Sequence, residues 1–508
     1  MLVTPEEMQA LEDAVFASGR ATPEELMDEA ALGIAGAILQ LCPSTGTAVV
    51  FAAKGHNGGD AIATARHLAS AGWQIDLRLT APRADLKPLT LRKLEQFDEF
   101  ERLAPTPPPQ APHGRPTIIL DGLLGIGASG PLRDDYRAQA RAINALRDRR
   151  TARTFAIDIP TGVDGDTGEV DPDAVMADFT LTIGRVKRGL VADTATSHVG
   201  RIALIPLGDL TPEPEGDRAG ADAFAITPHS LLYRLWHRPF DCHKGDAGRI
   251  GIVAGSRGFI GAAVLCAAAA VRGGGGLVTL FVPDDQTYPV AAGSVPPEAM
   301  VQPLGRLHEV LDRNLDVLAI GPGIGAGRDA DITELIEKFG GPLILDADAL
   351  NLLARRGLVP LERRDAAGFG TLLTPHPGEM RRLLGGAAVG DRAGCAREFA
   401  ARFQRLTLLL KGARTVVSSP GGKTVAFNTA ATPGMASGGM GDTLTGLCAA
   451  LAAVQPDLFG TACLAAWIHA RSAELALSHG GQSEESLVAS DVIDHLGGAM
   501  DAYRQGAY

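Results

Sequence analysis

The sequence is poor in cysteine and has no cysteine pattern typical of a metal site or a disulfide framework. It contains six cysteines in 508 residues, and none forms a Cys-x-x-Cys pair. Several lie in apolar, helix-like text such as "AAVLCAAAAV" around Cys266. We therefore expect buried free thiols in a reducing compartment. The first residues, "MLVTPEEMQALEDAV", lack the basic and apolar regions of a signal peptide, which predicts a cytoplasmic protein.

An excess of positive charge and a long unbroken apolar run are also absent. There are 47 Lys and Arg residues against 59 Asp and Glu residues, giving a net charge of −12. This balance disfavours nonspecific binding to nucleic acid or to an anionic membrane. The most apolar stretch, residues 261–282, is interrupted by Arg272 and four consecutive glycines. It predicts a buried helix followed by a strand, so we expect no membrane partner and small molecules as ligands.

No short internal repeat is present, but apolar, strand-like runs alternate with helix-like text in both halves of the chain. Continuous apolar strands separated by helices predict parallel sheets covered on both faces. A length of 508 residues also exceeds one ordinary domain. The sequence thus predicts two α/β domains. The expected strands lie within residues 47–54, 74–80, 117–124, 154–160, 179–184, 249–255, 276–283, 317–323, 342–349, 371–376 and 407–412.

The domain boundary is predicted in the polar, Pro- and Gly-rich segment 208–226, "GDLTPEPEGDRAGADAFAI". We expect an N-terminal domain over 1–215, a linker over 216–226 and a C-terminal domain over 227–508. The stretch 105–116 predicts a surface connection inside the first domain. Many expected strands end in Gly, Asp or Pro, where ligands bind in open α/β sheets.

The strongest motif is "GMASGGMGDTLTG", residues 434–446. Small residues ahead of a helix bring backbone N–H groups together, which suits an anion. Asp442 lies at this anion site, where phosphate would repel its carboxylate. A general base that accepts a hydroxyl proton during phosphoryl transfer explains its presence. The structural alternative is a glycine turn in which Asp442 caps the helix.

The motif occurs with others in the order found in one family. They are "HKGDAGRIGIVAGSRGFIGAA" (243–263), "GPGIG" (321–325), "LDADALNLL" (345–353), "LTPHPGEMRRLL" (373–384) and "LLKGARTVV" (409–417). This half resembles the ribokinase-like superfamily and, more narrowly, the ADP/ATP-dependent NAD(P)H-hydrate dehydratases. The resemblance implies a ribokinase-like α/β/α domain that dehydrates (6S)-NAD(P)H hydrate with ADP or ATP, ADP being favoured by similarity to bacterial two-domain members.

The resemblance also implies roles for individual residues of the second half. Asp442 would be catalytic and contact the hydrated cofactor together with Ala262, Gly323 and His376. Gly441 would contact AMP, and the nucleotide phosphates would bind Lys411, Gly412, Ala413, Arg414 and Thr415. Taken alone, Lys411 fits a surface lysine and His376 a structural histidine held between two prolines. Asp346 and Asp348 could place Mg²⁺, or Asp348 could cap the following helix.

Three segments of the first half resemble the NAD(P)H-hydrate epimerases. They are "AAKGHNGGDAIATARHL" (52–68), "LDGLLGIGASGPLR" (120–133) and "AIDIPTGVDGDTG" (156–168). The resemblance implies a Rossmann-like three-layer α/β/α domain that converts 6R to 6S hydrate. Asn57, Asp121 and Thr161 would hold potassium, and Asp158 would be the acid/base. The hydrate would contact Asp158 and two runs, one of His56, Asn57, Gly58, Gly59 and Asp60 and one of Gly125, Ile126, Gly127, Ala128, Ser129, Gly130 and Pro131.

The first epimerase loop departs from the family pattern at three positions. Ala53 and Ala61 replace glycines, and His56 replaces an asparagine. An alanine in a left-handed backbone position would strain the loop. Because unperturbed histidine titrates near pH 6.5, His56 predicts an epimerase that depends on pH between about 6 and 8. A domain that has lost its activity and serves only as a binding module is the alternative.

The combined expectation is a metabolite-repair enzyme with two activities. Its ligands would be hydrated NADH or NADPH and ADP, with potassium and Mg²⁺ as ions, and it would form a homo-oligomer. One rival is a ribokinase-like small-molecule kinase with a non-catalytic N-terminal binding domain. The fused epimerase-like half argues against this rival. A second rival, a non-enzymatic binding protein, is disfavoured by the intact "GMGD" and "KGARTV" segments.

Overall fold

The computed structural model describes residues 1–103, 116–128, 130–150, 152–211, 221–231, 234–283 and 285–507. The chain divides into two compact units, Met1–Ala219 and Gly220–Ala507, named here the N-terminal and C-terminal units. Residues 216–220 of the predicted linker, and all but residue 116 of the predicted connection 105–116, lie outside the described residues. The rest of the predicted linker includes the first strand of the C-terminal unit, because the short apolar run "AFAI" pairs into its sheet.

The N-terminal unit is built on a parallel sheet with the strand order β2-β1-β3-β4-β5-β6 in the described part of the chain. Its strands are β1 (Thr47–Ala52), β2 (Gln74–Leu79), β3 (Thr117–Gly122), β4 (Arg153–Ile157), β5 (Phe179–Ile183) and β6 (Arg201–Ile205). Its helices are α1 (Pro5–Ala17), α2 (Pro23–Leu41), α3 (His56–Ser70), α4 (Pro88–Leu103), α5 (Asp134–Arg150) and α6 (Thr196–Val199).

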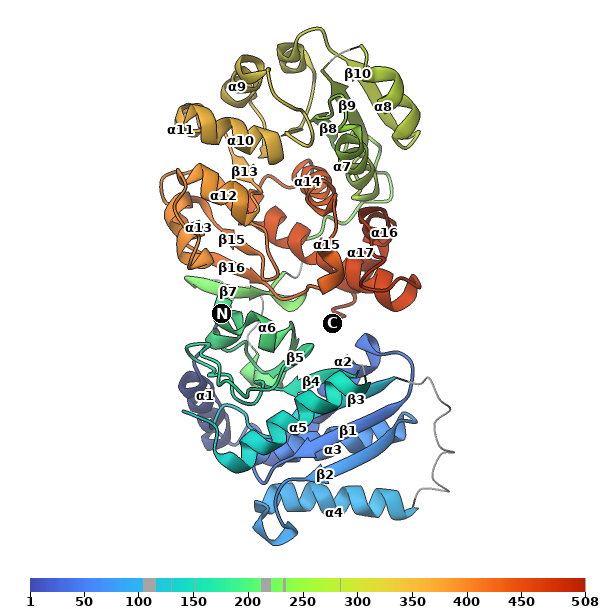
Figure 1. Cartoon of the computed structure of the whole chain (residues 1–508), viewed down its shortest axis with the longest axis vertical. Helices are drawn as coiled ribbons and strands as arrows, with labels where there is room; N and C mark the ends of the chain where they lie inside the picture. The colour runs from blue at the N-terminus through green and yellow to red at the C-terminus, as the bar shows by residue number, and fades with distance from the viewer. Residues whose placement is uncertain are drawn as a thin grey trace. The chain divides into compact units, whose positions relative to one another are not determined.

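Helices cover both faces of this sheet (Figure 1). The apolar sides of α2, α3 and α4 pack on one face, through residues such as Ile34, Ile62 and Phe97. Helix α5 covers the other face with Tyr136 and Ile143. The order of the strands reverses between β1 and β3, which makes the carboxyl ends of these two strands the expected ligand position.

The C-terminal unit has a longer sheet, with the order β10-β9-β8-β11-β12-β13-β14-β15-β16-β7 in the described residues. Its strands are β7 (Ala223–Ile226), β8 (Arg249–Val253), β9 (Leu277–Val282), β10 (Ala299–Pro303), β11 (Val317–Ile320), β12 (Leu343–Leu345), β13 (Thr371–Leu373), β14 (Leu406–Leu410), β15 (Val416–Ser418) and β16 (Val425–Asn428). Its helices are α7 (Ile260–Arg272), α8 (Tyr288–Ser294), α9 (Asp329–Lys338), α10 (Ala347–Arg356), α11 (Val359–Ala366), α12 (Pro377–Leu383), α13 (Arg392–Ala400), α14 (Met440–Ala452), α15 (Leu458–His479), α16 (Ala489–Asp494) and α17 (Leu496–Arg504).

One face of this sheet carries α7, α14 and α15, whose small and apolar residues form the main core of the unit with the strands. Helices α9 to α13 lie on the other side (Figure 1). The order of the strands reverses between β8 and β11, so the carboxyl ends of these strands face the second expected ligand position.

Both predicted three-layer α/β/α folds are confirmed, and each expected run contains a strand. The stretch 261–282 forms the end of α7 and β9, as expected. The named runs pair in parallel, as expected. The sequence did not indicate β15, which runs antiparallel to both β14 and β16. None of the six cysteines, all within the described ranges, forms a disulfide, and four of them are buried. No helix in the described ranges combines the length and apolarity needed to cross a bilayer.

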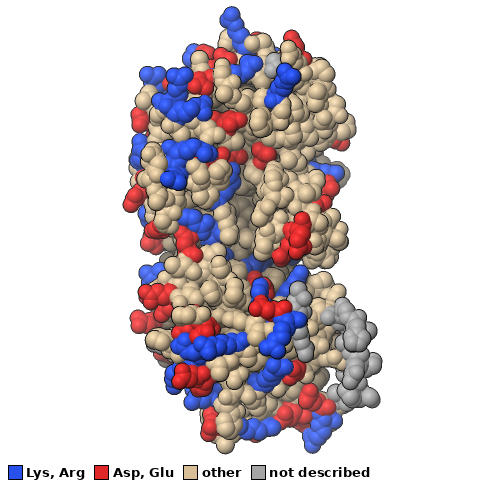
Figure 2. Space-filling view, viewed as in Figure 1, with Lys and Arg blue, Asp and Glu red and all other residues tan. Residues whose placement is uncertain are grey.

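Charges of both signs are interspersed on the face shown in Figure 2. Basic side chains gather over α9, α10 and α11, but acidic residues of α9 neutralise them. Arg355 and Arg356 pair with Asp329, and Arg363 pairs with Glu337. This group is therefore a set of surface ion pairs, which fits the expectation of small-molecule ligands better than an open basic surface would.

Two candidate active sites

A pocket of about 700 Å³ lies in the N-terminal unit where the sheet predicts one. The loops that follow β1 and β3 form two of its walls, and α1, α2 and the segment after β5 form others. Of the predicted contact residues, His56, Asn57, Asp60, Asp158 and every described residue from Gly125 to Pro131 line it. Ser129 lies outside the described residues.

The two central glycines of the first loop, Gly58 and Gly59, do not line the pocket but lie in the first turn of α3. A Cβ atom on Gly58 would lie 1.8 Å from the carbonyl oxygen of Ala53, and one on Gly59 would lie 2.7 Å from Cε of Met27. Both residues are buried. They let the start of α3 approach β1 and α2, so the structure explains these glycines through packing.

The alanines that replace family glycines fit this loop without strain. In the described residues, only Asp158 and Ala347 combine a side chain with a positive φ, so Ala53 and Ala61 avoid the left-handed region. The Ala61 methyl group occupies space next to Gly122, where an added Cβ would lie 2.3 Å from it. The glycine of the second loop thus accommodates the alanine of the first.

The three residues predicted to hold potassium lie together under the pocket. Asp121 accepts hydrogen bonds from the Thr161 hydroxyl and the Thr161 backbone N–H, both at 2.8 Å. The amide of Asn57 donates to the Leu124 carbonyl at 2.9 Å, and Leu124 donates to the Thr161 hydroxyl at 3.2 Å. Burial raises the pKa of Asp121 to about 6, although Thr161 lowers it.

Asp158, the predicted acid/base, forms a buried ion pair with Lys187. The Lys187 ammonium donates to Oδ1 of Asp158, and the two side chains are 1% and 9% exposed, respectively. The Ile183 backbone N–H donates to the same oxygen at 3.1 Å. The backbone of Asp158 has φ +67°, a strained value for a residue with a side chain. Strained backbone conformations of this kind are found mainly at functional sites.

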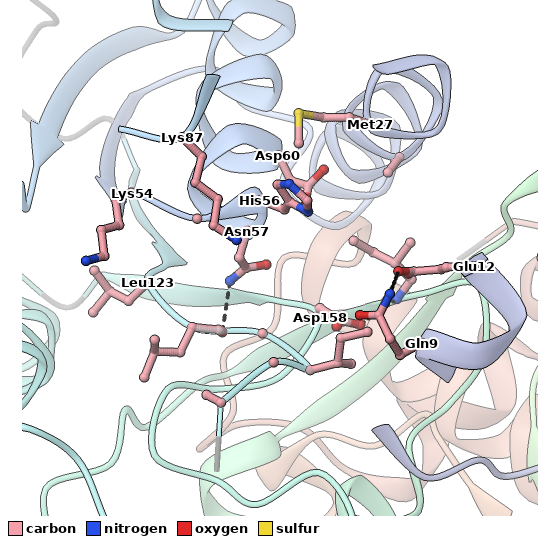
Figure 3. Close-up of a pocket in the computed structure, with 18 of the residues that line it drawn as sticks. Gln9, Glu12, Met27, Lys54, His56, Asn57, Asp60, Lys87, Leu123 and Asp158 are labelled. Atoms are coloured by element: carbon pink, nitrogen blue, oxygen red, sulfur yellow. Dashed lines mark hydrogen bonds between the residues drawn. The ribbon is translucent and has the colours of Figure 1, made fainter. Parts of the chain in front are cut away.

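Acidic and basic groups are separated along the pocket (Figure 3). Glu12 and Asp158 lie at one end, and Lys54 and Lys87 lie toward the other. Burial and the Asp158 carboxylate raise the pKa of Glu12 to about 7 and that of Asp60 well above its ordinary value. This separation suits a ligand with a phosphate-bearing end and a reacting ring.

The second site begins where β8 and β11 end in the C-terminal unit. The Ser256 hydroxyl donates to the Gly323 carbonyl at 2.8 Å, and the Gly255 backbone N–H donates to the Pro322 carbonyl at 2.9 Å. A Cβ atom on Gly323 would lie 3.2 Å from Cβ of Ala262. The fold thus brings together Ala262 and Gly323, two predicted contacts of the hydrated cofactor.

A charged cluster follows along the same edge of the sheet. The Lys411 ammonium donates to Oδ1 of Asp346 at 2.7 Å and lies 4.0 Å from Oε2 of Glu379. The Thr445 hydroxyl donates to the other Asp346 oxygen at 2.8 Å. Burial opposes the charge on Lys411, but Asp346 and Glu379 outweigh it and raise the Lys411 pKa. Ala347, next to Asp346, is the second described residue other than glycine that has a positive φ, at +48°.

Asp442 joins this cluster from the first turn of α14. Gly439 supplies the left-handed residue, φ +87°, that starts the helix. A Cβ atom on Gly441 would lie 3.1 Å from the Lys411 ammonium, so Lys411 approaches the helix N-terminus closely. Burial, followed by the Asp346 carboxylate, raises the pKa of Asp442 to about 6. A carboxylate with this pKa is suited to general-base catalysis near neutral pH.

The remaining predicted residues of this half differ in exposure. His376 caps α12, with Nδ1 accepting from Gly378 at 3.0 Å, and its side chain is 50% exposed. Gly412 and Ala413 are exposed, and Thr415 is partly buried. The Arg414 side chain is 1% exposed and donates to the Asn428 carbonyl at 3.3 Å. The structure therefore leaves Gly412 and Ala413 more open to a ligand than Arg414.

One of the two roles considered for Asp348, that of helix cap, is contradicted by the structure. Helix α10 begins at Ala347 with Asp346 as its N-cap residue, so Asp348 lies inside the first turn. Its carboxylate accepts from the Gly325 backbone N–H at 3.0 Å and so ties α10 to the loop after β11. The idea that Asp348 caps the helix is therefore wrong, and its part in placing Mg²⁺ stays a prediction.

Sequence reasoning missed three charged residues of these sites. Lys187 lies 29 positions after Asp158. Glu12 comes from a helix outside every epimerase motif. Glu379 completes a capping box with His376, a spacing visible in the text "HPGE". Only the last of these had a sequence signal that could have revealed it.

Comparison with known proteins relates both units to one kind of enzyme. The family described as NAD(P)H-hydrate dehydratase matches residues 250–495, and the family described as YjeF-related protein N-terminus matches residues 23–189. A bifunctional NAD(P)H-hydrate repair enzyme of Gloeobacter violaceus is 36% identical over 499 residues, covering 94% of each chain. One from Synechocystis sp. is 34% identical, covering 94% of this chain and 90% of that protein.

A solved structure from Bacillus subtilis is also similar to this chain. It is described as an ADP/ATP-dependent NAD(P)H-hydrate dehydratase co-crystallised with ATP and Mg²⁺. It is 29% identical, covers 55% of this chain and 98% of its own, and gives a TM-score of 0.47.

A carboxylate and a lysine at a glycine-rich helix start, on a ribokinase-like sheet, are typical of phosphoryl-transfer enzymes. The N-terminal, Rossmann-like unit has a separate pocket that contains acidic residues. The two units together indicate an enzyme with two sites, one of them for phosphoryl transfer. The chain belongs to the family of bifunctional NAD(P)H-hydrate repair enzymes, as its relatives along nearly the whole length show. The predicted pairing of dehydratase with epimerase is thereby confirmed, and the small-molecule kinase alternative is not supported.

Proposed function

We propose that the C-terminal unit dehydrates the 6S hydrate of NADH or NADPH at the expense of ADP. The hydrate carries a hydroxyl at C6, and hydroxide is a poor leaving group. Asp442 accepts the hydroxyl proton while the oxygen attacks the terminal phosphorus of ADP, releasing AMP. The lone pair of the ring nitrogen then expels phosphate, and loss of a ring proton restores the double bond of the reduced cofactor.

The position of Asp442 is the single observation that supports this proposal most strongly. Its carboxylate lies at the N-terminus of α14, beside the Lys411 ammonium and opposite Asp346. The helix start and Lys411 supply positive charge for a transferred phosphoryl group. A carboxylate at this position repels the phosphate groups of the bound nucleotide. Its presence is explained by a role as the base that accepts the proton of the attacking hydroxyl.

The charged cluster also fits Mg²⁺ carried with the nucleotide. Asp346, Glu379 and Asp442 bring three carboxyl groups close to one ammonium, that of Lys411. Oxygen ligands of this kind suit Mg²⁺, which usually binds through one or two carboxylates, waters and phosphates. When bound, the ion would neutralise charge that develops on the phosphates. Asp346 and Glu379 are the residues that we propose to hold it.

In the N-terminal unit we propose conversion of 6R to 6S hydrate, with Asp158 as the group that accepts a proton. The Lys187 ammonium pairs with this carboxylate and fixes it at the acidic end of the pocket. Lys54 and Lys87 are available to the phosphates of the cofactor at the other end. A hydrate bound in this direction places its ring next to Asp158.

Potassium fits the cluster of Asn57, Asp121 and Thr161. These residues offer amide, carboxylate and hydroxyl oxygens, the donors that hard cations prefer. Asp121 is buried, and no described Lys or Arg forms an ion pair with it. A bound monovalent cation would supply this missing charge and would steady the loops after β3 and β4.

One repair assay on the separated 6R and 6S hydrates tests both activities. Recovery of NADH absorbance from 6S hydrate with ADP and Mg²⁺ tests the dehydratase, and ATP replaces ADP in a parallel sample. Conversion of 6R hydrate in potassium and in tetramethylammonium buffer tests the epimerase and its cation. We expect recovery with ADP and slower conversion without potassium. A chain that phosphorylates the hydrate without restoring NADH would be a kinase instead.

A further inference from the structure

Helix α1 contributes to the epimerase pocket although it lies outside the matched family segment, residues 23–189. Three of its residues, Gln9, Glu12 and Phe16, line the pocket. Figure 3 shows Gln9 and Glu12 at the same end of the pocket as Asp158. Nothing in the motifs of the first half accounts for a carboxyl group at this position.

The backbone before α1 is attached directly to the segment that carries Lys187. Val3 forms a parallel bridge with Lys187, through hydrogen bonds from Val3 N–H to the Val186 carbonyl at 3.1 Å and from Arg188 N–H to the Val3 carbonyl at 2.8 Å. The side chain of Met8 then packs against Gly184, where an added Cβ would lie 2.7 Å from its Cε. Glu12 is one helical turn after Met8, so it lies on the same side of α1.

The start of the chain therefore sets the position of Glu12 relative to the Asp158–Lys187 pair. Glu12 is half-buried, and the charged groups around it are Asp158, Lys187, Asp60 and its helix neighbour Asp13. Its described hydrogen-bond partner is the amide of Gln9, at 3.4 Å. Asp158 has a lysine as counter-ion, whereas Glu12 faces mainly other carboxyl groups. Burial and the carboxyl groups around Glu12 raise its pKa to about 7, so this residue can carry a proton near neutral pH.

We infer that Glu12 is the second catalytic residue of the epimerase, acting as the acid opposite the Asp158 base. This inference rests on the proposed epimerase function. Neutral Glu12 gives its proton to the C6 hydroxyl of the 6R hydrate. The C6–O bond breaks as the lone pair of the ring nitrogen forms a C6=N bond, and water leaves. A second water adds to C6 from the opposite face and gives its proton to Asp158.

Atoms and charges balance in this sequence. One water leaves, one water adds, and the proton lost by Glu12 equals the proton gained by Asp158. The proton returns from Asp158 to Glu12 through solvent, and no oxidant or reductant is needed. The reverse reaction uses the same two groups with exchanged roles, as an epimerase requires.

Glu12 suits this role better than Asp60, the third carboxyl group of the pocket. Burial, Asp158 and Glu12 raise the pKa of Asp60 well above its ordinary value, which favours the protonated form of Asp60. A carboxyl group that stays protonated donates a hydrogen bond but does not exchange protons during turnover. The Glu12 pKa of about 7 allows both states. The geometry of α1 and this difference point to the same residue.

The test compares Glu12→Gln with Asp13→Asn in the full-length chain. Both variants remove one carboxyl group from α1, but Asp13 is exposed and does not line the pocket. We expect Glu12→Gln to slow 6R conversion by about 10²–10⁴-fold, as for loss of a general acid. Asp13→Asn should remain near the wild-type rate. Because dehydration belongs to the C-terminal unit, urea unfolding of the same samples reports whether the N-terminal unit stays folded.

A pH profile distinguishes catalysis from a merely structural role. The wild-type rate should fall as pH rises through about 7, because Glu12 loses its proton. The Glu12→Asp variant should show the same fall in rate. The residual activity of Glu12→Gln should lack it. If Asp158→Asn stops conversion while Glu12→Gln keeps the wild-type rate and profile, the role of Glu12 is overturned and the epimerase function stands. A wild type that never converts 6R hydrate overturns both.

Discussion

The Lys411 ammonium lies 2.7 Å from Oδ1 of Asp346, a residue 65 positions earlier in the chain. This pair joins the end of β14 to the start of α10 and places Lys411 beside the glycine-rich start of α14. Since Asp346 also faces Asp442, the pair controls the charge around the proposed base.

The first prediction concerns the pH dependence of dehydration. The Asp442 pKa is raised to about 6, and the base is active when deprotonated. The rate should therefore fall as pH drops through about 6. Asp346→Asn removes one of the charges that raise this pKa and should move the midpoint to lower pH. Asp501→Asn, which removes an exposed carboxylate from α17, is the control. Profiles that coincide for all three proteins would contradict the coupling of Asp346 to Asp442.

The second prediction concerns the buried pair in the N-terminal unit. Lys187→Met leaves the Asp158 carboxylate buried without its counter-ion. Breaking such a pair from one side costs about 3–5 kcal/mol. We expect the first unfolding transition in urea to move to lower concentration and 6R conversion to be lost. Arg188→Met, at the exposed neighbouring position, should leave both unchanged. An unshifted transition in Lys187→Met would show that the pair stabilises neither the fold nor the site.

The third prediction concerns His56, which the sequence predicts to make the epimerase depend on pH between about 6 and 8. Its pKa is lowered from 6.5, first by desolvation and then by the nearby Lys87 ammonium. The lowered pKa favours the neutral ring over most of the expected window of pH 6–8. His56→Asn should match the wild-type epimerase rate above pH 6.5 and differ only at lower pH. A difference confined to pH 7–8 would restore the original expectation.

The fourth prediction is that the two units are separable. Each has its own sheet and its own buried core. A fragment beginning near residue 220 should fold and dehydrate 6S hydrate at the rate of the full chain, as measured by NADH absorbance and circular dichroism. An insoluble fragment from an otherwise stable chain would mean that the units depend on each other for folding.

The sequence was most informative about the buried strands and about the glycine-rich loops that follow them. A short, continuous apolar run is compatible with few structures other than a buried strand. Glycines that permit close backbone approach, such as Gly58 and Gly321, also form a clear sequence pattern. The edge of the second sheet was less predictable, because β7, β15 and β16 contain only three or four residues each. Runs this short carry little periodicity.

The partners of the site residues were the least predictable part. Asp158 was recognised from its motif, but its counter-ion Lys187 depends on how the segment after β5 folds back. Glu12 lies in an amphipathic helix whose sequence gives no reason to single out one acidic residue among four. Its role depends on the bridge between Val3 and Lys187, a contact between residues 184 positions apart. Pairings of this range follow from tertiary structure and not from local sequence.

The most direct test of the whole account is the Asp442→Asn variant with 6S hydrate, ADP and Mg²⁺. The substitution keeps the shape of the side chain and removes its ability to accept a proton. Loss of a general base typically costs about 10²–10⁴-fold in rate. We expect the rate at which NADH absorbance recovers to fall by this factor, while calorimetry shows that ADP still binds. Recovery at the wild-type rate would contradict the proposed role of Asp442 and with it the mechanism of the C-terminal unit.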